Sequence, residues 1–289
     1  MGSVYRARDL HFPNVIKLVA VKEMINNAPD PLVRQTIVAN FEREANILVT
    51  LNHTSIPQIY DFFSREDRSY LVLEFIQGKD LEMILSEANA PLQEERVIAW
   101  AIELCDVLAF LHAHKPEPVI FRDMKPSNVM INQQGRSILV DFGIAKNFKT
   151  GQKGTMIGTE GYSPPEQYRG EATPVADIYA LGATLHHLLT NKDPRLEAPF
   201  SFSERPIRSI NPRISFELEA VINTALQYDP LDRFQNATDM KQALLSVAKK
   251  TGALSRISVS PILKDQAVKP VWTFKCEDEI RGTVAYEHG

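Results

Sequence analysis

The stretch that decides the fold is FRDMKPSNVMI at residues 121–131, followed by ILVDFG at residues 138–143. Each contains a short, β-rich apolar run, which predicts two short strands. Three polar side chains, Asp123, Asn128 and Asp141, stand at the ends of these runs, where side chains emerge at a cleft. Phosphoryl transfer needs such groups, because a carboxylate orients the attacking hydroxyl and oxygen ligands hold magnesium on the phosphates.

Upstream of this stretch the chain is rich in strand patterns. Residues 15–22 are short and apolar and predict a strand, and residues 56–63 and 69–76 predict an antiparallel hairpin. Between them, residues 31–51 carry apolar positions at spacings of four, four and three, which is one face of a helix. The first part is therefore predicted to be a small strand-rich lobe with one helix.

Downstream the period changes to that of helices. Apolar residues recur at helical spacing over 97–111, 177–190, 216–227 and 237–248, which predicts a larger helical lobe. Residues 144–170 are polar and follow neither period. A loop of that length is usually functional or mobile.

Composition excludes several classes of protein. The 289 residues are 44% hydrophobic and 24% charged, the balance of a globular protein, and 32 basic minus 36 acidic residues gives a net charge of −4. No basic stripe is present for nucleic acid, and no apolar run of about 18 residues could span a membrane. Two distant cysteines favour a reducing, cytoplasmic setting over a disulfide framework.

Together with Lys22 in VAVK (19–22), the order of these motifs resembles the eukaryotic-type serine/threonine protein kinases of bacteria. The resemblance covers residues 1 to about 248. It implies an α+β bilobal fold, with a small lobe at about 1–75 and a helical lobe at about 76–248. It also implies ATP and Mg²⁺ as cofactors, and transfer of the γ-phosphoryl group to Ser or Thr of proteins, including the kinase itself.

The resemblance assigns a role to each central residue. Asp123 would accept the proton of the substrate hydroxyl, and Lys125 would lie near the transferred phosphate. Asn128 and Asp141 would hold magnesium, and Lys22 would grip the α- and β-phosphates. Any one of them alone would be read as a solvated charge, but the ordered set is specific.

Other positions match the nucleotide site. Glu44 would pair with Lys22, the segment 73–76 would bind adenine with Leu73 guarding the back of the pocket, and Asp80 would reach the ribose. The remaining expected contacts are Gly2, Val4, Ala20, Glu74 and Ile76.

Further matches are structural in character. Glu166 would form an ion pair with Arg233, and Asp177 would anchor the loop that holds Asp123. An apolar column joining the lobes is expected from Leu48, Ile59, Phe121 and Phe142, although ordinary core packing would also explain these residues.

Arg122, which precedes Asp123, implies regulation by a phosphate on the polar loop. Thr150 and Thr155 are the expected acceptors, with loop threonines of no regulatory role as the alternative. Thr159 is expected to contact the substrate and supports specificity for Ser and Thr.

Histidine and cysteine residues elsewhere are expected to be structural. His112 and His114 are interpreted as a helix cap or surface pair, and His186 and His187 as packing residues of a helix. Cys105 is expected to be a buried thiol.

The two ends depart from the family pattern. Of the phosphate-covering G-x-G-x-x-G-x-V loop only Gly2-Ser3-Val4 is present, so the first strand is missing and we expect a gene fragment or a misassigned start, with a natural short form as the alternative. After a predicted linker at 249–270, residues 271–289 resemble the first strands of a quinoprotein-type β-propeller; an unrelated tail is the alternative.

Two other functions compete with the kinase. A truncated or pseudokinase binding module is favoured by the lost glycines and opposed by the presence of Lys22, Asp123, Asn128 and Asp141. A small-molecule phosphotransferase is opposed by GTEGYSPPEQY (158–168) and Arg233, which belong to a platform for protein substrates.

Overall fold

The structure, a computed structural model, describes residues 3–11, 14–25, 38–39, 41–42, 45–65, 68–142 and 159–251. The chain divides into two compact units, Met1–Arg256 and Ile257–Gly289, and the described residues all belong to the first. The propeller-like tail therefore lies outside the described residues, as does the linker from residue 252 onwards.

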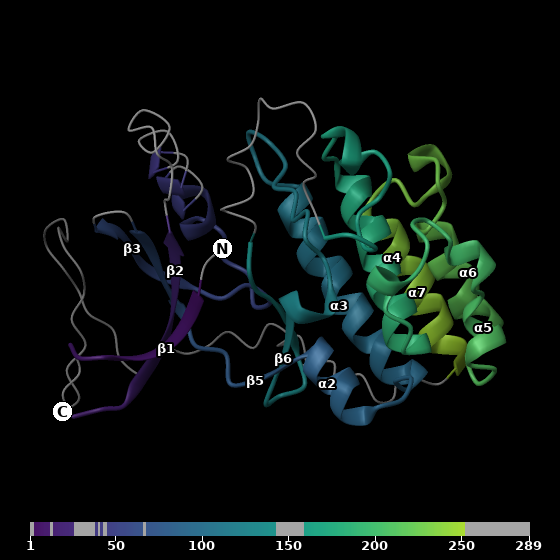
Figure 1. Ribbon diagram of the computed structural model, residues 1–289, viewed down its shortest axis with the longest axis horizontal. Helices are drawn as coiled ribbons and strands as arrows, with labels where there is room; N and C mark the ends of the chain where they lie inside the picture. Colours follow the sequence, from purple (N-terminus) through teal and green to yellow (C-terminus); the bar gives the residue numbers. More distant parts are fainter. Residues whose placement is uncertain are drawn as a thin grey trace, which may run out of the picture. The chain divides into compact units, whose positions relative to one another are not determined.

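The small lobe is built on one antiparallel sheet (Figure 1). Its strands are β1 (Ser3–Asp9), β2 (Lys17–Ile25), β3 (Ile59–Arg65) and β4 (Arg68–Glu74), in the order β1-β2-β4-β3. The predicted hairpin is present as β3 and β4, and the predicted strand at 15–22 is present as β2. The sequence did not predict β1, because most of its side chains are exposed and it lacks the apolar alternation of a half-buried strand.

The register of the sheet puts Lys22 opposite Leu71, and Ala20 opposite Leu73. Described helical residues at 38–39, 41–42 and 45–49 belong to the helix predicted at 31–51. Phe41, Ala45 and Leu48, three of the apolar positions on its predicted face, are all buried.

The larger lobe is helical, as predicted. Its helices are α2 (Leu81–Ala88), α3 (Glu94–His112), α4 (Pro174–Thr190), α5 (Ile207–Ile210), α6 (Phe216–Ala225) and α7 (Ala237–Thr251). Because α7 continues to Thr251, the linker predicted from residue 249 cannot begin that early. Short 3₁₀ turns lie between the elements of this lobe: η1 (Pro126–Asn128), η3 (Gln167–Arg169), η4 (Pro194–Leu196), η5 (Phe202–Glu204) and η6 (Pro230–Asp232).

A second, small sheet carries the deciding stretch of sequence. Strands β5 (Gly78–Asp80), β6 (Val129–Asn132) and β7 (Ser137–Leu139) pair antiparallel in that order. Both predicted short strands are thus confirmed, and the α+β architecture with them.

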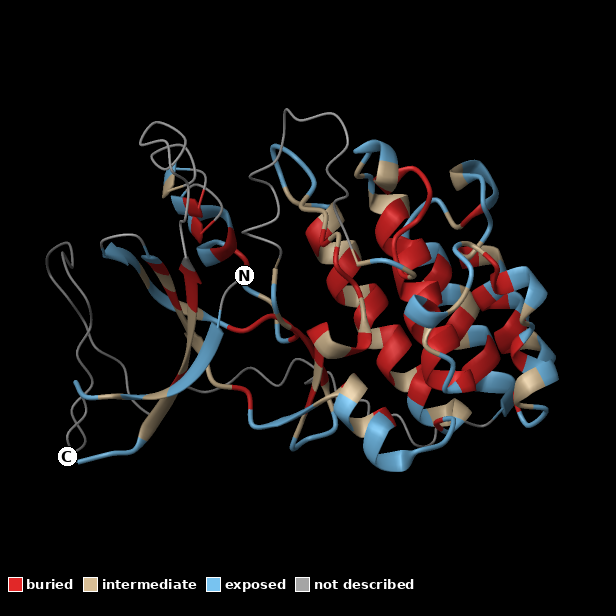
Figure 2. Ribbon diagram, in the orientation of Figure 1, coloured by how far each residue is buried: buried red, intermediate tan, exposed pale blue. Residues whose placement is uncertain are grey.

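The core of the larger lobe gathers on α3 and α4 (Figure 2). Helix α4 begins with Pro174 at its first position and ends at Thr190, followed by the cap residue Asn191, whose φ of 52° is left-handed. Every residue from 176 to 190 is buried, so α4 is enclosed on all sides. Its polar side chains can therefore reach only other parts of the protein. Among the described residues, no helix is long and apolar enough to cross a membrane.

Candidate active site

Asp177 of α4 anchors the loop that carries Asp123. The backbone N–H groups of Phe121 and Arg122 donate to the two carboxylate oxygens of Asp177 at 2.9 and 2.7 Å. Asp177 is fully buried, and Arg122 adopts a left-handed φ of 66°. A backbone conformation of this kind persists where its surroundings hold it in place. The anchoring contact predicted for Asp177 is present.

His112 also belongs to this anchor, which corrects the interpretation of a cap or surface residue. Its Nε2 lies 2.8 Å from Asp177 Oδ2, and its side chain is 9% exposed. Helix α3 packs against α4, so the last turn of α3 faces the carboxylate and not the solvent. His114, two residues later, is half-buried and contacts the carbonyl of Glu117.

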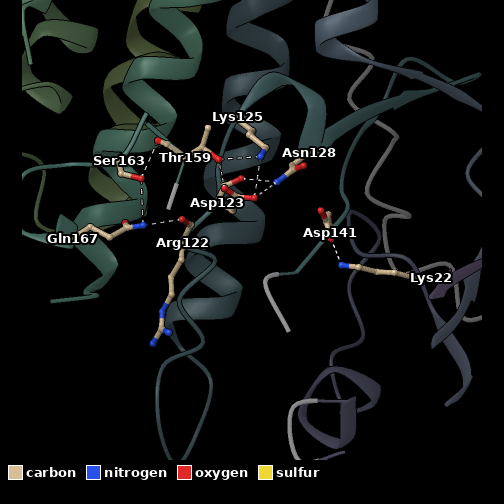
Figure 3. A network of polar contacts seen from close by, with 9 residues as sticks. All are labelled: Lys22, Arg122, Asp123, Lys125, Asn128, Asp141, Thr159, Ser163 and Gln167. Carbon is tan, nitrogen blue, oxygen red and sulfur yellow. Dashed lines mark hydrogen bonds and ion pairs between the residues drawn. The ribbon is translucent and has the colours of Figure 1, made fainter. Parts of the chain in front are cut away.

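Asp123 lies at the centre of a polar cluster (Figure 3). Its Oδ1 accepts from the Thr159 hydroxyl at 2.6 Å, and its Oδ2 accepts from Asn128 Nδ2 at 2.7 Å and lies 3.2 Å from Lys125 Nζ. Lys125 Nζ also donates to the Thr159 hydroxyl at 2.9 Å. The structure thus brings together four of the residues that the sequence singled out, from two segments of the chain.

Asp141 and Lys22 form a second group beside this cluster (Figure 3). They are joined by a hydrogen-bonded ion pair, in which the Lys22 side chain is 13% and the Asp141 side chain 47% exposed. Asp141 has a left-handed φ of 63°. This pair connects β2 of the small lobe to the segment after β7. Glu44, the expected partner of Lys22, lies outside the described residues.

The oxygen atoms of Asn128 and Asp141 fit a magnesium ion. Asn128 is buried, and its Nδ2 is used by the carbonyl and the carboxylate of Asp123, which leaves its side-chain oxygen as an acceptor. Among the described residues, no cluster of three or more His, Cys, Asp or Glu could hold a metal. Magnesium does not need one, because it is bound by one or two carboxylates together with waters and substrate phosphates.

A cavity of about 370 Å³ opens between the sheet of the small lobe and β6. Most of the nucleotide contacts expected from the sequence line it: Val4, Ala20, Lys22, Leu73, Glu74, Phe75, Ile76, Asn128 and Asp141. Asp80 does not; its carboxylate caps α2 by accepting from the Met83 N–H at 2.7 Å. Gly2 lies outside the described residues. The cavity is therefore largely apolar, with polar side chains that include Lys22, Asn128 and Asp141.

The expected apolar column is consistent with the packing. Leu48, Ile59 and Phe142 line the same cavity, and the rings of Phe142 and Phe121 meet edge to face with centroids 5.3 Å apart. Phe121 is 1% exposed. Phe121 is thus a packing residue, as expected.

The predicted ion pair between Glu166 and Arg233 is present. Arg233 donates from two nitrogens to the two carboxylate oxygens at 2.6 and 3.1 Å, and both side chains are at most 2% exposed. Arg233 also donates to the carbonyls of Gln227 and Tyr228. The pair ties the segment after Thr159 to the turn before α7.

Sequence reasoning missed two polar residues of this segment, Ser163 and Gln167. Both are buried, and both contact the cluster around Asp123 and Arg122. In a stretch that is polar throughout, the sequence offers no sign of which amide or hydroxyl is buried. Thr150 and Thr155 lie outside the described residues, so their expected phosphorylation stays a prediction.

The remaining structural residues are buried as expected. Burial raises the pKa of the Cys105 thiol, which suits an inert side chain. His187 is within 2.7 Å of the Tyr162 hydroxyl, and burial lowers the pKa of this histidine and raises that of the tyrosine. His186 bonds the carbonyl of Arg205.

Comparison with known proteins gives one family. A family model described as "Protein kinase domain" matches residues 1–251. The chain is 34% identical over 264 residues to serine/threonine-protein kinase C of Synechocystis sp., covering 84% of this chain and 47% of that protein. It is 33% identical over 263 residues to the probable serine/threonine-protein kinase PknB of Lactococcus lactis, covering 87% of this chain and 40% of that protein. The chain thus spans less than half the length of these curated relatives.

Solved structures show the same fold. The apo form of PpkA-294 has a TM-score of 0.70 at 23% identity, over 84% of this chain and 91% of that one. The PknI kinase domain of Mycobacterium tuberculosis has a TM-score of 0.65 at 24% identity, over 85% and 91%. At these identities the likeness concerns the fold alone.

Proposed function

This chain belongs to the protein kinase family, in its eukaryotic-type serine/threonine branch with bacterial relatives, and we propose that it transfers the γ-phosphoryl group of ATP to serine or threonine residues of proteins. The observation that carries the proposal is that Lys22, Asn128 and Asp141 line one cavity, while Asn128 also bonds Asp123, which in turn pairs with Lys125. A largely apolar cavity with these polar side chains on its wall suits a purine nucleotide with its phosphates.

The residues divide the work of transfer between them. Asp123 Oδ1, which accepts a hydroxyl hydrogen from Thr159, has the geometry to orient a substrate hydroxyl in the same way. Lys125 and Lys22 place positive charge on either side of the transferred group. Asn128 and Asp141 would hold Mg²⁺, which neutralises charge on the phosphates when bound.

The proposal extends to regulation and to two further nucleotide contacts. The Ser/Thr proteins phosphorylated would include the kinase itself, with a phosphate on Thr150 or Thr155 acting through Arg122. Asp80 and Glu44 would join the nucleotide site on its ribose side and beside Lys22. A reducing, cytoplasmic setting suits the free, buried thiol of Cys105.

Labelled-phosphate transfer from Mg-ATP to a generic basic protein and to the chain itself tests the proposal. Asp123→Asn preserves the shape of the side chain and removes its charge, so we expect transfer to fall by at least about a hundredfold. Asp239→Asn, an exposed residue of α7, is the matched control and should transfer normally. Transfer that survives Asp123→Asn would refute the assignment.

The alternative, a nucleotide-binding module without catalysis, makes a different prediction. It requires that the unmodified chain bind a fluorescent ATP analogue but transfer no phosphate to either acceptor. Binding and transfer are therefore measured on the same preparation.

A further inference from the structure

Gln167 is a buried amide aimed at the backbone of the catalytic loop. It lies in η3, directly after Glu166, and is 2% exposed. Its Nε2 donates to the carbonyl oxygen of Arg122 at 2.9 Å and lies 3.4 Å from Ser163 Oγ (Figure 3). A buried amide is retained where it is hydrogen-bonded, and this one bonds the residue that precedes Asp123.

The residue that Gln167 contacts is held from both sides. The N–H of Arg122 donates to Asp177 at 2.7 Å, while its carbonyl accepts from Gln167. That carbonyl belongs to the peptide unit joining Arg122 to Asp123. Because a peptide unit is planar, fixing its oxygen fixes the plane that contains the N and Cα of Asp123, from which the side chain branches.

Gln167 also reaches the carboxylate of Asp123 by a second route. Ser163 Oγ, its other contact, donates to the carbonyl of Thr159 at 3.1 Å. The hydroxyl of Thr159 in turn donates to Asp123 Oδ1 at 2.6 Å. The Gln167 amide is therefore connected to Asp123 in two ways. It bonds the peptide group that precedes Asp123, and it reaches the Asp123 carboxylate through Ser163 and Thr159.

We propose that Gln167 is a positioning residue for phosphoryl transfer. It holds the Asp123 carboxylate in place against residues 159–163, the segment that contains Thr159 and faces the substrate. The inference rests on the proposed kinase activity. A purely structural role is already filled by its neighbour, since Glu166 is fixed to Arg233 by two hydrogen bonds and accepts from the N–H of Arg169. The turn at η3 is thus secured without the amide of Gln167.

The test is steady-state kinetics of Gln167→Met, which keeps the length of the side chain and removes the donor. We expect kcat, expressed per nucleotide-binding site, to fall about tenfold while the KM for ATP and the Kd of a fluorescent ATP analogue stay within about twofold. Gln167 is not among the residues that line the cavity, so nucleotide binding should be spared.

Gln167→Glu adds a signature that lost packing would not produce. A carboxylate facing the Arg122 carbonyl cannot donate, but a protonated carboxyl can. Burial raises the pKa of such a carboxyl, so the ratio of variant to unmodified kcat should rise as the pH falls from about 8 to about 6. The same ratio for Gln167→Met should be flat.

Two further variants serve as controls. Ser163→Ala removes the hydroxyl but leaves the Ser163 N–H on the Thr159 carbonyl at 3.2 Å, so a smaller loss of kcat is expected. Gln235→Met removes an exposed amide that also donates to backbone carbonyls, at Pro230, Leu231 and Arg233, and kcat should be unchanged.

The inference is overturned if an active chain keeps its kcat within about twofold in Gln167→Met. For Gln167→Glu, a ratio of variant to unmodified kcat that does not change with pH would overturn the inference as well. This measurement is the deciding one if Gln167→Met does not fold. An inactive unmodified chain would remove the proposed function and this inference together, whereas active protein with unaffected variants removes the inference alone.

Discussion

At the scale of single residues, burial decides how much an ion pair matters. The Arg233 side chain is 0% and the Glu166 side chain 2% exposed, whereas that of Arg195, which pairs with Glu82 and Asp193, is 41% exposed. Arg233→Met leaves a buried carboxylate without its partner and should lower the free energy of unfolding by about 3 to 5 kcal/mol. Arg195→Met should cost at most about 1 kcal/mol.

Urea denaturation of both variants beside the unmodified chain measures this difference. Equal losses would show that the contact of Arg233 with Glu166 is not special. A shift in the midpoint without a change in slope would assign the effect to stability alone.

The same scale marks where sequence reasoning succeeds and fails. Asp123, Asn128, Asp141 and Lys22 could be named because fixed spacing and chemistry tie them to a family pattern. His112 was misjudged, since its contact with Asp177 depends on how two helices far apart in sequence pack. Only tertiary structure shows which of two histidines near a helix end is enclosed.

At the scale of elements, helix α4 makes stability depend on pH. His186 is 1% exposed and lies beside Arg205 and His187, and burial lowers its pKa from 6.5 to about 4. The unfolded chain therefore binds a proton below pH 6.5 that the folded chain takes up only near pH 4. The neutral, buried His186 therefore makes its full contribution to stability above pH 6.5. As the pH falls from 6.5 to about 4, the free energy of unfolding decreases by up to about 3 kcal/mol.

Urea midpoints across this pH range check the prediction. His186→Gln should flatten the dependence, and His114→Gln, a half-buried control outside α4, should leave it unchanged. Parallel curves for His186→Gln and the unmodified chain would contradict it.

Elements also differ in how well the sequence predicts them. Helices α3, α4 and α7 and the β3–β4 hairpin were predicted, because each buries one face or more and so carries a clear period. Strand β1 was not, because pairing with β2 over seven residues, and not burial of apolar side chains, defines it. Backbone pairing at an exposed edge leaves little trace in the side chains.

At the scale of the whole described unit, Lys22 joins the two lobes. It extends from β2 to Asp141 of the helical lobe, at the edge of the cavity. Mg-ATP bound there should stabilise the protein, by about 2.7 kcal/mol at a concentration about 100 times the Kd. Lys22→Met should remove most of the resulting rise in Tm.

Thermal denaturation with and without Mg-ATP measures the effect. Lys17→Met is the matched control on the same strand, since Lys17 packs over the Tyr60 ring and pairs with Asp9, away from the cavity. A full nucleotide-dependent shift in Lys22→Met would show that Lys22 does not bind the phosphates.

The enclosure of α4 has a consequence for control of the proposed activity. The carboxylate that shapes the Asp123 loop is part of the hydrophobic interior, so any chain whose helical lobe has folded has already assembled that half of the machinery. A signal that broke the contacts of Asp177 would have to disrupt the packing of α4, and with it most of the stability of the lobe. Reversible control costs less stability on the side of Lys22. There the ion pair between Lys22 of β2 and Asp141 after β7 can open and close while the rest of the protein stays folded.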